Sequence, residues 1–256
     1  MLFTLNGIAK LKESGRMAII QNGSPLFSGQ AGSGESEIRR YIIENDWLEA
    51  IVQLPTDLFY NTGISTYIWL INKHKNAIRE GKVQLIDASN CYESRRKNIG
   101  NKRKDISEEC KNLILKAYDD FQNKEYCENG KSAESKIFDN TDFGFNRITI
   151  ESPLFDEKQK IIKDKNGKIK ADSSKRDYEN IPLLEDIEQY FKREVLPYNE
   201  NAWIDKKKTI VGYEIPFTRY FYKYVEPEDS KIIEKRIRKN EKDIINSLEK
   251  LFKEDK

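Results

Sequence analysis

The sequence is poor in the residues that build metal sites and disulfide frameworks. It contains one histidine, His74, which excludes metal sites and proton relays that need two imidazoles. Its three cysteines, Cys91, Cys110 and Cys127, are odd in number and form no Cys-x-x-Cys pair. That pattern is typical of reduced thiols in the cytosol. We therefore expect a cytoplasmic protein with no metal site.

Long apolar runs and targeting signals are also missing. The longest apolar run, residues 67–71, is far shorter than the roughly 20 residues that a membrane-spanning helix needs. Residues 1–4 lack the charged start and the small-residue cleavage site of a signal peptide. The sequence therefore predicts a soluble chain with no membrane contact.

What the chain does contain is charge and aromatic residues. Charged residues make up 34% of its 256 residues, but 45 Lys and Arg nearly balance 43 Asp and Glu, which leaves a net charge of +2. The 13 Tyr, 12 Phe and 3 Trp argue against a disordered chain. This length is sufficient for one or two domains with hydrophobic cores.

The first 90 residues alternate between two periodicities. Apolar residues at helical spacing predict a helix over residues 2–11 and another around Ile38 and Ile42. Short, nearly continuous apolar runs predict buried strands at residues 17–20, 48–54, 66–72 and 83–88. This alternation predicts an α/β fold with both faces of the sheet covered.

The remainder of the chain is more polar. Residues 156–180 are dominated by Lys, Asp, Asn and Ser, which predicts a flexible hairpin or a disordered insert. Helical spacing returns over residues 183–195 and in a C-terminal helix from Pro227, where Ile237, Ile244 and Leu251 are seven residues apart. No internal repeat is evident.

These patterns predict three regions. Residues 1–128 would form a partial α/β domain, residues 129–180 a polar connecting segment with an insert, and residues 181–256 a helical region.

One basic cluster stands out. Six cations fall within ten residues with no acid among them: Arg95, Arg96, Lys97, Lys102, Arg103 and Lys104. Such a cluster suits the phosphate backbone of a nucleic acid. A solvated surface loop explains it equally well from the residues alone.

Two loops are candidates for binding. In residues 54–66, Phe59 and Tyr60 follow a predicted strand, where an exposed aromatic can stack on a base. The spacing favours core anchoring for Tyr60 and leaves both roles open for Phe59. The Gly-Ser loop at residues 28–33 lacks the P-loop and dinucleotide signatures, which favours a mobile loop over a phosphate site. No residue has the surroundings of a catalytic acid or base.

Several segments resemble the modification (methyltransferase) subunits of type I restriction–modification systems. The first group is GRMAIIQNG at residues 15–23, AIVQLP at residues 50–55 and FYNTGI at residues 59–64. The second group is IFDNTDFG at 137–144, ITIE at 148–151, PLLED at 182–186, YFKREVLP at 190–197, AWI at 202–204 and VGYEIPFTRYFY at 211–222. Together these segments cover most of the chain outside the polar insert.

The resemblance implies the C-terminal half of a Rossmann-like class I methyltransferase sheet, followed by a mostly helical extension. Subunits of this family transfer methyl from S-adenosylmethionine to adenine N6 in DNA. They use a Gly-rich cofactor loop and an Asn-Pro-Pro-Phe/Tyr motif, and this sequence contains neither. The resemblance therefore implies no catalytic or cofactor-binding residue here, and we expect this chain alone to be inactive.

The resemblance also suggests roles for the two candidate features. Phe59 matches an aromatic that stacks on the extruded adenine in related enzymes, and the run from Arg95 to Lys104 would face the DNA backbone. The implied partners are DNA, a specificity subunit and a restriction subunit. We also expect self-association, because the strand near residues 16–21 would leave one edge unpaired. The alternative is a non-enzymatic module that binds DNA or a partner and docks through its C-terminal helices.

Overall fold

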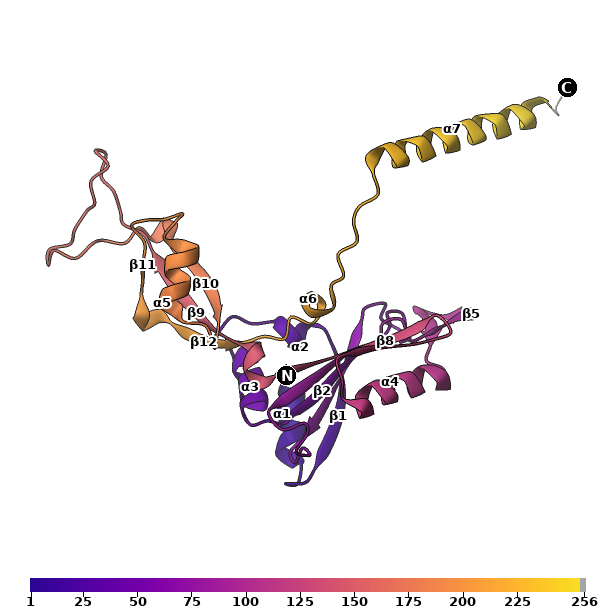
Figure 1. The fold of residues 1–256 in the computed structure, drawn as a ribbon, viewed down its shortest axis with the longest axis horizontal. Helices are drawn as coiled ribbons and strands as arrows, with labels where there is room; N and C mark the ends of the chain where they lie inside the picture. Colours follow the sequence, from indigo (N-terminus) through magenta and orange to yellow (C-terminus); the bar gives the residue numbers. More distant parts are fainter. Residues whose placement is uncertain (254–256) are drawn as a thin grey trace. The chain divides into compact units, whose positions relative to one another are not determined.

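A computed structural model describes residues 1–253 of the chain, which divides into two units, Met1–Phe217 and Thr218–Lys256. The first unit contains two main β-sheets and a separate hairpin, and the second contains one long helix (Figure 1). No helix among the described residues is long and apolar enough to cross a membrane.

The larger sheet has six strands in the order β1-β3-β2-β4-β8-β7. β2 and β4 are parallel neighbours, and the other neighbouring pairs are antiparallel. β2 and β4 are almost fully buried, whereas β1 alternates between exposed and half-buried residues at the edge of the sheet. The strands are β1 (Arg16–Asn22), β2 (Leu48–Gln53), β3 (Thr66–Asn72), β4 (Lys82–Asp87), β7 (Lys124–Glu128) and β8 (Lys131–Asp139).

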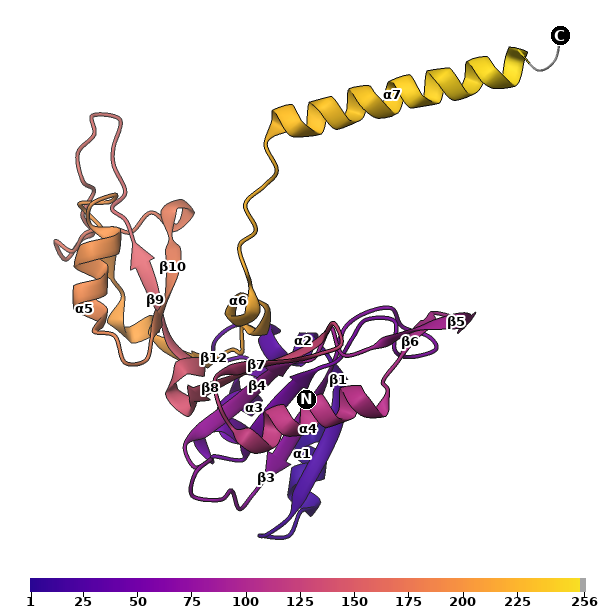
Figure 2. The same ribbon diagram turned by 45° about the vertical axis from the view of Figure 1, so that its right-hand side comes forward.

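Two of the longer helices of this unit begin at serine caps. Ser33 Oγ accepts a hydrogen bond from Ser36 N at the start of α3 (Gly34–Glu44), and Ser107 Oγ accepts one from Cys110 N at the start of α4 (Glu108–Asp120). α4 packs across one face of the sheet with its apolar side buried (Figure 2). Two further helices precede α3 in the chain, α1 (Leu2–Lys10) and α2 (Ser24–Phe27).

The smaller sheet is built around β9 (Gly144–Glu151). β10 (Asp177–Pro182) pairs with one side of β9, while β11 (Trp203–Ile204) and β12 (Ile210–Tyr213) also pair with it. The helical segments α5 (Ile187–Tyr190) and η3 (Phe191–Val195) pack on this sheet through its apolar cluster. Three short 3₁₀ turns are η1 (Asn140–Phe143), η2 (Ser173–Lys175) and η4 (Lys206–Lys208).

A buried arginine joins the two sheets. Arg39 on α3 is 1% exposed, and its guanidinium donates to Tyr213 O at 2.6 Å and Pro25 O at 3.0 Å. Burial lowers the pKa of Arg39. Ser36 Oγ also accepts a hydrogen bond from Tyr213 N at 3.0 Å. These bonds fix β12 against α3.

The second unit consists mainly of α7 (Ser230–Lys253), while α6 (Phe217–Phe221) spans the division between the units. Ile237, Ile244 and Leu251 on α7 are 61%, 60% and 64% exposed, which confirms the predicted apolar stripe on this helix.

The structure confirms the α/β prediction and corrects details. The helix expected over residues 183–195 begins only at Ile187, because Asp186 Oδ1 accepts Gln189 N at 2.8 Å and caps it there. Residues 129–180, expected to connect two regions, contain β8, which pairs with β4 and β7 in the larger sheet, and β9 with most of β10 in the smaller sheet. These strands carry many charged residues, so their apolar pattern is weak.

Candidate nucleic-acid interface

Two loops leave the larger sheet at the same edge. β2 and β4 are parallel, with Gln53 opposite Asp87, so the segments that follow them emerge together. Residues 54–65 follow β2, and the hairpin of β5 (Glu93–Ile99) and β6 (Lys102–Asp105) follows β4. The carboxyl ends of parallel strands are where open α/β sheets bind their ligands.

Phe59 and Tyr60 have opposite environments in the first loop. Phe59 is half-buried, packs against the core cluster around Val52 and Leu58, and forms a β-bridge with Thr62. Tyr60 is 58% exposed. The expectation that Tyr60 anchors the loop is therefore wrong, because the Phe59–Thr62 bridge places Tyr60 at the tip of a tight turn. The base-stacking role of Phe59 stays a prediction.

The β5–β6 hairpin is fastened to this loop through the backbone. Asn101 N donates to Tyr60 O at 2.9 Å, and the N–H groups of Arg103 and Lys104 donate to Asp57 O at 2.9 and 3.2 Å. Gly100 has φ +57°, and a Cβ there would lie 2.8 Å from Tyr60 O. The structure thus brings together two features that are 35 or more residues apart in the sequence.

Two of the six predicted cations are paired on the hairpin itself. Asp105 binds Arg95, and Lys102 Nζ lies 2.8 Å from its other carboxylate oxygen. The hydrogen bond from Lys102, with the charge of Arg95, lowers the pKa of Asp105, so this carboxylate is ionised at neutral pH and offsets part of the local positive charge. Asp105 lies one residue beyond the cluster recognised in the sequence.

Three other cations are available to a ligand. Arg96, Lys97 and Arg103 are exposed, and their side chains form no ion pair with any residue that the structure describes. Lys104 is half-buried, because its Nζ lies 3.8 Å from the Tyr92 ring centroid and donates to Thr56 Oγ1 at 3.2 Å. The hairpin therefore presents a smaller free charge than the sequence suggests.

The Gly-Ser loop does not form an anion site. Gly29 and Gly32 have φ +84° and +78°, and a Cβ at Gly32 would lie 3.1 Å from the Ile210 side chain on β12. Ser33 caps α3, and Glu35 and Glu37 in the first turn of that helix repel an anion. The loop instead lets the two sheets approach closely.

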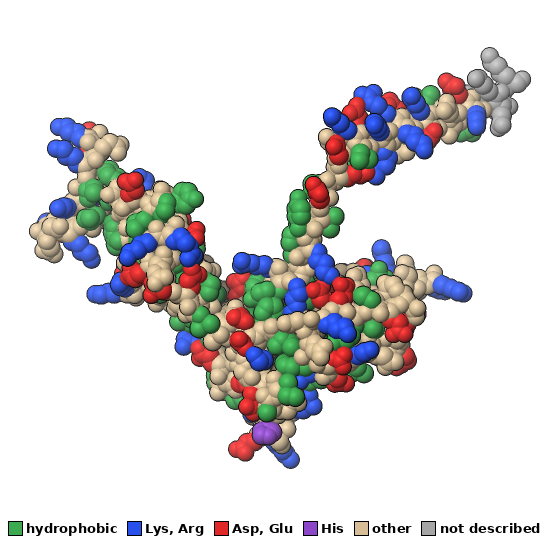
Figure 3. All heavy atoms as spheres, viewed as in Figure 1, with side chains coloured by type: hydrophobic (Ala, Val, Ile, Leu, Met, Phe, Trp, Pro, Cys, Tyr) green, Lys and Arg blue, Asp and Glu red, His purple; other side chains and the backbone are tan. Residues whose placement is uncertain are grey.

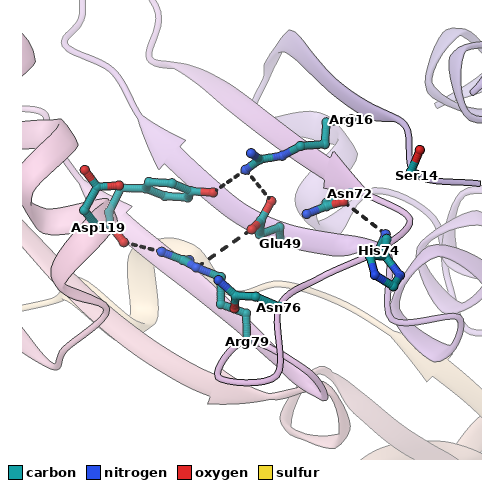
Figure 4. A pocket seen from close by; sticks show the side chains of 9 residues that line it. Ser14, Arg16, Glu49, Asn72, His74, Asn76, Arg79 and Asp119 are labelled. Atoms are coloured by element: carbon teal, nitrogen blue, oxygen red, sulfur yellow. Dashed lines mark hydrogen bonds and ion pairs between the residues drawn. The ribbon is translucent and has the colours of Figure 1, made fainter.

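A polar cleft of about 390 Å³ opens at the other end of the strands (Figure 4). Glu49, at the start of β2, accepts a hydrogen bond from Arg16 at 3.1 Å and lies 3.8 Å from Arg79 Nε. Arg16 also donates to Tyr118 Oη at 2.8 Å. His74 lines this cleft and is exposed, in line with its expected surface position. Glu49 is thus paired with Arg16 and Arg79. The bond from Arg16 to Tyr118, which lies on α4, holds that helix to the sheet.

A sequence signal was available for one missed hairpin. β7 and β8 are joined by Asn129 and Gly130, which have φ +48° and +78°. Asn-Gly between two strands is a strong signal for a tight β-hairpin. The β5–β6 hairpin also has a turn signal, Gly100-Asn101, with φ +57° at Gly100, but its strands are mostly exposed and charged and so show no apolar pattern.

Comparisons with known proteins agree with the resemblance. A family profile described as N-6 DNA Methylase matches residues 1–157. The MjaIX methylase subunit of a type I restriction enzyme from Methanocaldococcus jannaschii is 48% identical over 71 residues, covering 27% of this chain and 13% of that protein. The MjaVIII methylase subunit from the same organism is 27% identical over 178 residues, covering 69% of this chain and 29% of that protein.

A solved structure shows a more distant likeness. The crystal structure of a type I restriction-modification system methyltransferase subunit from Streptococcus thermophilus has 24% sequence identity and a TM-score of 0.45, covering 54% of this chain and 26% of that one. The chain thus spans less than a third of the length of each of these relatives.

Proposed function

Because the chain belongs to the N-6 DNA methylase family, we propose that it forms the C-terminal part of a type I modification subunit. In the complete subunit it would contribute DNA contacts to the methylation of adenine N6. One observation carries this proposal. The β5–β6 hairpin holds three free cations beside the Phe59 loop, at the carboxyl ends of β2 and β4.

The two parts of this interface would have different tasks. Arg96, Lys97 and Arg103 would neutralise phosphates, which adds affinity without reading sequence. Phe59 would offer a ring face to an extruded adenine, while its other side stays packed on the core. A ring held in this way loses little conformational freedom when a base stacks on it.

S-adenosylmethionine is the methyl donor that the family implies, and the Gly-rich segment of this chain does not offer a site for it. Loop 28–33 packs against β12, so this loop is not free to close around a cofactor. We therefore assign no cofactor-binding or catalytic role to this chain and place those roles in the rest of the complete subunit.

Two further surfaces would serve assembly. β1 pairs with β3 on one side, and no described strand pairs with its other edge; Leu2 and Phe3 on α1 are 76% and 84% exposed. An open strand edge is a template for pairing with another chain. The exposed apolar stripe of α7 favours docking on a partner helix, which in a type I complex would be the specificity subunit or the restriction subunit.

Salt-dependent DNA binding tests the interface. The variant Arg96→Gln/Lys97→Gln/Arg103→Gln should bind all duplex sequences more weakly than wild type, with the slope of log K against log salt smaller by up to about 2.7. Arg95→Gln/Lys102→Gln is the comparison variant and should change the slope less, because both side chains are half-buried in ion pairs with Asp105, which offsets one of their two charges. An unchanged slope in the triple variant would contradict the proposed DNA contact.

A further inference from the structure

A projecting arm, residues 153–176, rises from the smaller sheet between β9 and β10 (Figure 1). It consists of three turns that start eight residues apart, at Asp156, Asp164 and Asp172. In each turn the aspartate side chain accepts a hydrogen bond from the N–H two residues later. In each turn the aspartate carbonyl also accepts one from the N–H three residues later. The arm is therefore a short repeat, which the sequence did not reveal because its copies share few side chains.

The three copies also bind one another. Ile162 N donates to Leu154 O at 2.9 Å, Lys170 N to Ile162 O at 2.9 Å, and Leu154 N to Lys170 O at 2.8 Å. These residues are again eight apart, so the backbone closes into a ring of three hydrogen bonds. The arm expected to be flexible or disordered is instead internally bonded.

A buried carboxylate anchors the base of the arm. Glu151, at the end of β9, is 3% exposed and accepts from Arg176 and from Lys208, each at 2.8 Å. Asp172 N donates to Ser152 O at 2.8 Å, and Asn199 Nδ2 to Ser152 Oγ at 2.8 Å. The arm is thus held on the sheet through both of its ends.

The arm carries an excess of basic side chains, and most of these have no acidic partner among the residues that the structure describes. Residues 156–176 contain eight basic and four acidic side chains, while the net charge of the whole chain is only +2. The carboxylates of Asp156 and Asp164 face their own turn backbone. Lys158, Lys160, Lys163 and Lys165 are exposed and form no ion pair with any residue in the described part of the chain. Lysine and arginine side chains gather along this arm in Figure 3.

We propose that this lysine arm is a second DNA contact, which binds phosphates away from the β5–β6 hairpin. The proposal rests on the proposed function, since it concerns DNA held by the same subunit. The aspartates order the backbone in advance, so the lysines are presented without the entropic cost of folding a disordered tail on binding.

The surface chemistry favours nucleic acid over a protein partner. Protein interfaces are built on buried aromatic or aliphatic anchors, and lysine is depleted in them. The exposed large apolar residues described on the arm are Ile161 and Ile169, which are only 36% and 39% exposed. Lysine binds phosphate as a mobile point charge, which suits a contact that does not read sequence.

The test measures duplex DNA affinity of the full chain by fluorescence anisotropy over a range of salt. The arm variant is Lys158→Gln/Lys160→Gln/Lys163→Gln/Lys165→Gln. Its matched control, Lys10→Gln/Lys12→Gln/Lys116→Gln/Lys124→Gln, changes the net charge equally at exposed lysines outside both interfaces. The arm variant should bind at least about tenfold more weakly at low salt, with the slope of log K against log salt smaller by up to about 3.6.

Each result has a distinct meaning. Loss in the arm variant with little loss in the control supports the proposal. Equal losses in both would show a general charge effect and overturn it, as would no loss in the arm variant. If the arm variant loses no affinity but the hairpin variant Arg96→Gln/Lys97→Gln/Arg103→Gln does, the proposed function stands without the arm. If neither variant loses affinity, the proposed function and the arm proposal both fail. If the arm variant keeps its affinity for DNA but no longer binds a purified specificity subunit, the arm is a protein contact and the proposal is also overturned.

Discussion

Glu49, with the two arginines Arg16 and Arg79 beside its carboxylate, offers a sharp test of how buried charge stabilises this fold. Glu49 and Arg79 have side chains only 4% and 6% exposed, whereas Arg16, on the other side of the same carboxylate, is 62% exposed. Glu49→Gln keeps the shape of the side chain but leaves the Arg79 guanidinium buried without a counter-charge. Removing one partner of a buried ion pair costs about 3–5 kcal/mol.

We expect the lower end of that range, about 3 kcal/mol. Arg79 keeps its hydrogen bond to Gln84 at 2.9 Å and its contact with the Tyr118 ring at 4.1 Å. Arg16→Gln removes an exposed partner of the same carboxylate, so it should cost less than about 1 kcal/mol.

Urea unfolding followed by circular dichroism measures both variants. With a slope of about 1–3 kcal/mol per M, Glu49→Gln should lower the unfolding midpoint by about 1–3 M. The double variant Glu49→Leu/Arg79→Met should be more stable than Glu49→Gln, because no charge is then left buried. If Glu49→Gln and Arg16→Gln shift the midpoint equally and slightly, the buried pair does not stabilise the fold as argued.

Four other predictions follow from the described residues. In a complete subunit, Phe59→Leu should slow single-turnover methylation about ten- to a hundredfold, because base stacking is lost. Phe59→Tyr and the neighbouring control Tyr60→Ala should keep rates near wild type. An unchanged rate in Phe59→Leu would show that Phe59 is a core residue only. Titration calorimetry of this chain with S-adenosylmethionine should show no micromolar binding, and such an affinity would contradict our placement of the cofactor site. Light scattering should detect self-association of this chain, and Ile20→Lys on the β1 edge should reduce it; a monomer at all concentrations would show that the edge does not pair. Burial raises the pKa of Cys91 from 9.0 to about 12, so between these two pH values the folded state keeps a proton that the unfolded state loses. The free energy of unfolding should therefore fall by up to about 1.4 kcal/mol per pH unit in this range. Cys91→Ala should reduce this slope, and an unchanged slope in that variant would show that Cys91 does not cause it.

Local sequence patterns determined the elements whose side chains are strongly apolar. The strands at residues 48–54 and 66–72 were predicted because β2 and β3 are mostly apolar and mostly buried. The helix ending near Lys10 and the stripe on α7 were predicted for a similar reason, since helical periodicity is a property of neighbouring residues. The family resemblance likewise came from short local segments.

Tertiary structure decided the elements that are stabilised by distant partners. β5 and β6 carry charged, exposed side chains, and their position depends on backbone bonds to Asp57 and Tyr60, which no local pattern encodes. The ordered lysine arm depends in the same way on a backbone ring and on Glu151 beneath it. Side-chain periodicity reports burial, whereas backbone hydrogen bonds between distant segments leave no periodic trace in the sequence. The candidate residues could therefore be named from the sequence, but their assembly into one interface could not.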